Sequence, residues 1–169
     1  LEFVDIITNH VMNSTDTNVG GWPASEARTY VNTDIYNALP TELKNGIVNT
    51  TVVSGHGSTT GETNFTSTDK LYLLSTHEVW QDVDGNTSSG IDYYDKAYNN
   101  TRQLDYYSAQ NVTPSDYSGA KKNGPHDYWW LRSASSRNWY FFDIVHAAGD
   151  WYGDSSYGAY GVSPVFRIG

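Results

Sequence analysis

Apolar residues occur along this chain in short runs that are separated by polar, turn-forming segments. Residues 1–12 are mainly apolar and β-branched, and residues 47–54 alternate between apolar and polar positions, so each range predicts a strand. Residues 70–75 form a short apolar run that predicts a buried strand. Near the end of the chain, further strands are predicted at residues 128–132, 139–145 and 162–168.

Helices are predicted between these strands, and all of them are short. Apolar residues recur at helical spacing after Pro23 and continue through residue 32. Thr33 can cap a second short helix, which extends to residue 38. Pro40 can open a third helical turn over residues 41–45, which the following glycine would terminate.

The middle of the chain carries a capping signal and then a long polar region. Ser75 and Glu78 have the spacing of a capping box, which predicts a helix with Val79 and Trp80 facing the core. Residues 82–124 are rich in Asn, Ser, Asp and Tyr and show little periodicity, so we expect long ordered loops pinned by tyrosines. The overall pattern predicts an α+β fold with short helices packed on small antiparallel sheets.

Length and composition limit the classes of protein that this chain can represent. We interpret its 169 residues as one domain, residues 1–169, and the absence of an initial Met leads us to expect missing N-terminal sequence. A net charge of −9 disfavours a nucleic-acid partner, and no apolar run reaches the length that a membrane helix requires. Cysteine is absent, which excludes thiolate catalysis and cysteine-ligated zinc.

Metal sites and catalytic centres are not predicted. The five histidines lack the helical spacing of zinc ligands, and no Ser has the context of a nucleophile elbow. Asp143, Asp150 and Asp154 could cluster around calcium, and residues 82–92 place oxygen-bearing side chains at alternate positions, but the latter segment lacks the final Glu of a calcium loop. We therefore expect no enzyme activity, no cofactor and no metal.

The last third of the chain has the composition of a binding surface. Between Arg137 and Tyr160 there is no Lys, Glu, Gln, Met, Thr, Leu or Pro, and large aromatic residues alternate with Gly, Ser, Asp and Ala. Paratopes use this mixture, because rigid rings supply contact area and small residues adapt the backbone. The alternative is that these loops pack on each other. The candidate ligand-binding residues are Arg137, Asn138, Tyr140, Phe142, His146, Asp150, Trp151, Tyr152, Asp154, Ser155, Ser156, Tyr157 and Tyr160.

Three separated blocks carry a resemblance to a known family. They read GGWPASEARTYVN, DKLYLLSTHEVW and, at the end, WWLRSAS with GVSPVFRIG. Together they resemble prokaryotic and phage surface domains of the C-type lectin-like fold, and in particular the variable proteins of diversity-generating retroelements. The resemblance implies a C-type lectin-like scaffold, a variable ligand-binding region at residues 133–161, and a protein or glycan ligand on a cell surface. It also implies a location on a virion tail or fibre, or on a prokaryotic cell surface.

Two further readings accompany the resemblance. A fixed-specificity carbohydrate-binding or cell-wall-associated module is the alternative function, and formylglycine-generating enzymes of the same fold are excluded because their chemistry requires cysteine. We expect the WWLRS and GVSPVFRI strands to be neighbours in one sheet that holds both ends of the variable region. Arg132 and Arg167 are expected to pair with carboxylates or carbonyls, and Trp22, Trp129 and Trp130 to lie in the core.

Overall fold

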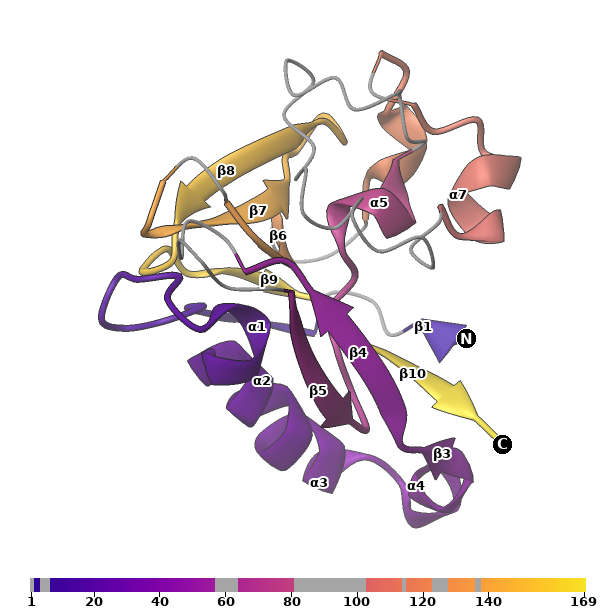
Figure 1. Cartoon of the computed structure of the whole chain (residues 1–169). Coiled ribbons are helices and arrows are strands. Elements are labelled where there is room, and N and C mark those ends of the chain that lie inside the picture. Colours follow the sequence, from indigo (N-terminus) through magenta and orange to yellow (C-terminus); the bar gives the residue numbers. More distant parts are fainter. Residues whose placement is uncertain are drawn as a thin grey trace.

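The computed structural model describes residues 2–3, 7–56, 64–80, 103–113, 115–122, 128–135 and 138–169. Figure 1 shows a row of short helices along one side, a β-hairpin beside them, and a five-stranded sheet at the other end of the molecule. The architecture is mixed α and β with short elements, in agreement with the predicted α+β class. The calcium-like segment at residues 82–92 lies outside the described ranges.

The helical row follows the capping signals of the sequence. It comprises α1 (Gly21–Ala24), α2 (Glu26–Tyr30), the π-helical turn η1 (Val31–Ile35), α3 (Tyr36–Ala38) and α4 (Thr41–Gly46). The Ser25 hydroxyl accepts a hydrogen bond from the Arg28 N–H, which fixes the start of α2. The predicted helical character of residues 23–38 and 41–45 is confirmed, but the prediction that Thr33 caps a second helix was wrong: Thr33 lies within the π-helical turn, and its hydroxyl donates to the Thr29 carbonyl.

Strands form three sheets. The five-stranded sheet has the order β2 (Thr8–His10), β9 (Tyr160–Val162), β6 (Trp129–Ala134), β7 (Phe141–Val145) and β8 (Trp151–Ser155), and only the β6–β9 pairing is parallel. A three-stranded sheet contains β1 (Glu2–Phe3), β10 (Val165–Ile168) and β3 (Ile47–Val48). The hairpin pairs β4 (Thr50–Ser54) with β5 (Phe65–Asp69).

Several strand predictions were wrong. Residues 1–12 and 162–168, each predicted as one strand, divide between two sheets, so β9 lies beside β6 whereas β10 does not. Residues 70–75 are buried, but they form only a single bridge, between Tyr72 and Val165. Residues 151–155 were expected to be loop and instead form β8, because pairing with β7 outweighs the turn preference of Gly and Asp.

The remaining described elements follow the hairpin in sequence and precede β6. Helix α5 (Thr76–Val79) begins with the predicted capping box of Ser75 and Glu78. Helix α7 (Asp105–Ala109) and the 3-10 turn η3 (Ser118–Ala120) fall within the region that was predicted as loop. Long polar segments with isolated aromatic residues can therefore contain short helices that periodicity does not reveal.

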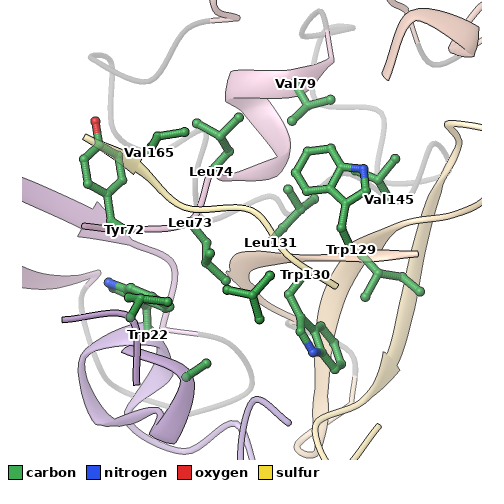
Figure 2. Close-up of a cluster of buried hydrophobic side chains, with 14 of the residues drawn as sticks. Trp22, Tyr72, Leu73, Leu74, Val79, Trp129, Trp130, Leu131, Val145 and Val165 are labelled. Carbon is green, nitrogen blue, oxygen red and sulfur yellow. The ribbon is translucent and has the colours of Figure 1, made fainter. Parts of the chain in front are cut away.

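The core is built around buried tryptophans. Trp22, Trp80, Trp129 and Trp130 are each at most 1 % exposed, which confirms the predicted positions of Trp22, Trp129 and Trp130. Figure 2 shows Leu131 near the centre, with the indoles of Trp129 and Trp130 pointing in opposite directions. Because both faces of β6 are buried, this strand is a rigid support for the neighbouring strands.

A buried ion pair links β6 to α5. The Arg132 guanidinium donates to the carbonyl oxygens of Val53 and Leu73 and to a carboxylate oxygen of Glu78. The predicted pairing of Arg132 is therefore confirmed. Arg167 differs from Arg132 because its side chain is exposed and hydrogen-bonds to the Tyr72 side chain, which partly offsets the rise that burial causes in the pKa of that hydroxyl.

Candidate functional site

The strand register places alternate side chains of the five-stranded sheet on a common face. Tyr152 of β8 lies opposite Ile144 of β7, which in turn lies opposite Trp130 of β6. Residues two apart on a strand share a face, so Asp154 lies on the same side as Tyr152. Ring and hydrogen-bond contacts add three further residues. We call the resulting surface the aromatic face; it consists of Tyr128, Trp130, His146, Tyr152, Asp154 and Tyr160.

The rings of the aromatic face contact one another in series. Tyr128 stacks on His146 with centroids 4.4 Å apart, and its edge meets Tyr160 at 5.6 Å. Tyr160 also makes an edge-to-face contact with Trp130 at 5.0 Å. Trp130 is fully buried and forms the floor, whereas Tyr152 is 55 % exposed. These contacts hold the rings in place before any ligand arrives.

Carboxylates accompany the rings. The Tyr160 hydroxyl donates to Asp154 Oδ2 over 2.5 Å, and Asp154 Oδ1 accepts the N–H of Ser155. His146 Nδ1 lies 3.3 Å from Asp150 Oδ1. Burial, together with the hydrogen bond to Asp154, raises the pKa of Tyr160 to about 12. The Tyr160 hydroxyl therefore remains a donor throughout the physiological pH range.

The titration of Tyr160 gives a testable prediction. Between pH 10 and about 12, the folded protein retains a proton that an unfolded tyrosine, with its ordinary pKa of 10.0, would release. The stability contributed by this group should therefore fall as the pH rises through that window. Ultraviolet titration of tyrosinate should show a late-titrating residue that is lost in Tyr160→Phe. In Asp154→Asn its pKa should move toward the ordinary value; an unchanged titration curve in both variants would contradict the assignment.

Further aromatic side chains are exposed in the loops that precede β7 and follow β8. Trp139 and Tyr157 are 60 % and 64 % exposed. Trp139 makes an edge contact with Tyr140, which makes another with Phe141, at centroid distances of 5.0 and 4.6 Å.

Asn18 anchors the loop that precedes β7. Its side-chain amide, which is fully buried, donates to the carbonyl oxygens of Ser135, Asn138 and Phe141 at 2.8 to 2.9 Å. Its backbone N–H donates to the carbonyl of Trp139. One side chain from the N-terminal part of the chain therefore fixes a segment that is more than a hundred residues away in sequence.

Removal of this anchor should loosen the loop. We expect Asn18→Ala to lower the free energy of unfolding by about 1 to 3 kcal/mol, because several buried carbonyls lose their donor. Denaturant unfolding followed by circular dichroism measures the change. The matched control is Asn49→Ala at an exposed loop position, which should change stability by less than about 0.5 kcal/mol. Equal effects of the two substitutions would show that the buried amide carries no special role.

The structure divides the predicted ligand-binding residues into accessible and inaccessible sets. Phe142 and Ser156 are fully buried, so the prediction that they contact ligand was wrong: Phe142 points into the core, and the Ser156 hydroxyl faces Asp16. Arg137 lies outside the described residues. The accessible or half-buried members are Asn138, Tyr140, His146, Asp150, Trp151, Tyr152, Asp154, Ser155, Tyr157 and Tyr160.

Not all accessible members lie on one surface. Trp151 and Ser155 alternate with Tyr152 and Asp154 on β8, so their side chains occupy the opposite face of the sheet. The Ser155 hydroxyl donates to Asp16, and Trp151 packs against the core. The predicted ligand-binding residues did not include Tyr128, which belongs to the aromatic face, or Trp139, which is 60 % exposed.

Metal-binding clusters and membrane-spanning helices are two further features that a chain of this kind can carry. Within the described ranges, no group of three or more His, Asp or Glu side chains could hold a metal ion. No helix among the described residues is both long enough and apolar enough to cross a membrane. The aromatic face is accordingly the site with the strongest geometric support.

Comparison with known proteins gives one match. The family model of a domain of unknown function, DUF6273, matches residues 3–169. No curated protein and no solved structure matches the chain.

Proposed function

The chain belongs to the DUF6273 family, and we propose that its aromatic face binds a ligand non-covalently. The observation that carries the proposal is the exposure of large rings beside a well-filled core: Tyr152 of the aromatic face is 55 % exposed and Trp130 beneath it is fully buried, while Trp139 and Tyr157 are exposed in the loops next to β7 and β8. Contiguous exposed apolar surface on a folded domain is typical of an interaction site. The preset ring contacts reduce the entropy that binding would cost.

The scaffold and the surface use side chains of neighbouring strands in one sheet. Phe142 and Ile144 of β7 are buried, while Tyr152 and Asp154 of β8 remain accessible beside them. Side chains on the surface can therefore change without loss of the core. We propose that this arrangement is a C-type lectin-like domain on a virion or a prokaryotic cell surface; its short helices and small sheets support that assignment, as do the three sequence blocks.

We also propose that residues 133–161 are diversified by a retroelement. In that case, substitutions among clones of the same locus should concentrate at exposed positions such as Tyr152 and Tyr157. They should spare the buried positions Phe142, Ile144 and Ser156. Sequencing of clones and of the neighbouring DNA tests this; a template copy beside a reverse transcriptase is expected, and divergence spread evenly over the chain would contradict it.

A fixed-specificity carbohydrate-binding module is the second candidate function. The neighbouring ring and carboxylate of Tyr152 and Asp154 favour it, because a ring can cover the apolar face of a sugar while a carboxylate accepts hydrogen bonds from its hydroxyls. Screening the domain against a glycan array and an array of cell-surface proteins separates the two candidates. A single glycan class retained by every clone supports the second.

Tyr152→Ala should separate binding from folding. We expect this substitution to weaken binding of the ligand retained on either array by about 2 kcal/mol, since Tyr152 is a central exposed ring. Stability should change by less than about 0.5 kcal/mol. Tyr106→Ala on α7 is the matched control, because Tyr106 is also 55 % exposed but lies outside the aromatic face. Equal loss of affinity in both variants would contradict the proposed location.

A further inference from the structure

The charged side chains along β8 are acidic. Asp150 and Asp154 lie in the segment 138–166, which contains no Lys or Arg, and the whole chain carries a net charge of −9, while Lys121 packs against Gly149 beside this segment. Electron-rich rings and carboxylates both attract cations. The charge and the ring chemistry therefore both favour a positively charged ligand.

The spacing of these groups matches an extended partner. Asp150, Tyr152 and Asp154 occupy alternate positions on the extended segment that includes β8, so they share a face. At about 3.3 Å per residue, the two carboxylates lie on either side of the Tyr152 ring and are separated by about 13 Å of strand. A partner strand has the same two-residue period. Every second side chain of the partner strand would therefore lie beside Asp150, Tyr152 or Asp154.

The backbone of β8 supplies a docking edge. This strand is the outer member of the five-stranded sheet, and Figure 1 shows it at the margin of the molecule. The His146 N–H donates to the Asp150 carbonyl, and the Ser156 N–H donates to the Tyr140 carbonyl. Backbone groups alternate in direction along a strand, so the N–H and C=O groups of the even-numbered residues from 150 to 156 point toward β7. Trp151 and Gly153 therefore direct their N–H and C=O groups away from the sheet. Within the described part of the chain, no strand pairs with this side of β8.

We propose that the ligand of the aromatic face is an extended basic segment of a partner protein, which adds as a strand along β8 and places Arg or Lys side chains over Tyr152 between Asp150 and Asp154. This inference rests on the proposed function and specifies its ligand class. Main-chain hydrogen bonds to Trp151 and Gly153 provide affinity, and the ring and carboxylates provide selectivity for positive charge.

Synthetic peptides test the proposal on the full chain. An alternating Arg-Thr peptide should bind, as measured by isothermal titration calorimetry, and its affinity should fall as salt concentration rises. Methylation of alternate backbone nitrogens of the peptide should abolish binding, because strand addition requires those donors. A Glu-Thr peptide should show no binding. Equal binding of the acidic peptide, no binding of the basic one, or indifference to backbone methylation overturns the inference.

Matched variants locate the basic peptide. Asp150→Asn combined with Asp154→Asn should weaken its binding at least about tenfold, equivalent to two exposed charge pairs. Asp34→Asn combined with Glu42→Gln removes the same charge from exposed positions of the helical row and should change affinity less than about twofold. Equal losses in the two variants would overturn the site, and their melting temperatures verify that both remain folded.

The same experiments distinguish the inference from the proposed function. If the domain binds a glycan or a neutral peptide through Tyr152 and ignores the Arg-Thr peptide, the basic ligand class is wrong and the aromatic face remains a binding surface. If Tyr152→Ala leaves the binding of every retained ligand unchanged, the proposed function itself fails.

Discussion

Arg132→Met is expected to lower the free energy of unfolding by about 3 to 5 kcal/mol. Arg132 is 3 % exposed, and its guanidinium donates to two carbonyls and to Glu78. Glu78 Oε2 also accepts the Ser75 N–H that begins α5. Met can fill much of the volume, but it leaves a carboxylate in a largely buried position without its partner. Denaturant unfolding measures the loss, and Arg167→Met at an exposed position serves as the control, with an expected change below about 1 kcal/mol.

A double-mutant cycle shows whether the loss comes from the ion pair. Glu78→Gln alone should also be destabilising, because it leaves the guanidinium without a carboxylate. The combined variant should be less destabilised than the sum of the two single variants, since neither buried charge then remains unpaired. Strictly additive losses, or an Arg132→Met variant within about 1 kcal/mol of the parent, would contradict the role assigned to the pair.

Trp130→Ala should have a comparable cost, about 3 to 5 kcal/mol, and should also damage the binding surface. Trp130 is fully buried, its indole N–H donates to the His10 carbonyl over 2.8 Å, and its ring supports Tyr160. The substitution leaves a cavity beneath the aromatic face. Because Tyr160 then becomes more hydrated, its pKa of about 12 should fall toward the ordinary value of a tyrosine.

The controls for Trp130 separate packing from surface chemistry. Trp130→Phe retains a ring, so it should keep part of the lost stability and most of the upward pKa shift of Tyr160. Trp139→Ala removes an indole that is 60 % exposed and should change stability by less than about 1 kcal/mol. A Trp130→Ala variant that unfolds like the parent, with an unaltered tyrosinate titration, would show that this indole is not the floor of the surface.

Local signals account for the elements that the sequence predicted well. Pro40 precedes the first residue of α4, and the spacing of Ser75 and Glu78 marks α5, because capping depends on residues three or four apart. Thr33, by contrast, was predicted as a cap and lies within the π-helical turn. Strand β8 has no such signal: Gly153 and Asp154 favour turns in isolation, and only pairing with β7 makes them extended. The predicted strand boundaries were also wrong where one apolar run contributes strands to two sheets.

The candidate site was predicted only in part. The composition of the window directed attention to exposed residues such as Tyr152 and Tyr157, but composition does not report burial, and so it included Phe142, which is fully buried although it shares a face of the sheet with Asp154. Two other contributions come from distant parts of the chain. Asn18 reaches carbonyls 117 to 123 residues away, and Tyr128 joins the aromatic face through contacts with His146 and Tyr160. Neither contact has a signature in a single sequence.

The central claim is that the aromatic side chains of this region are displayed by the fold and do not hold it together. The most direct measurement is the Tm of a variant that carries Trp139→Ser, Tyr152→Ser and Tyr157→Ser together. We expect a cooperative transition and a Tm within about 4 °C of the parent, since all three rings are at least 55 % exposed. A loss of cooperative unfolding, or a much larger fall in Tm, would show that these rings belong to the core and would contradict the account.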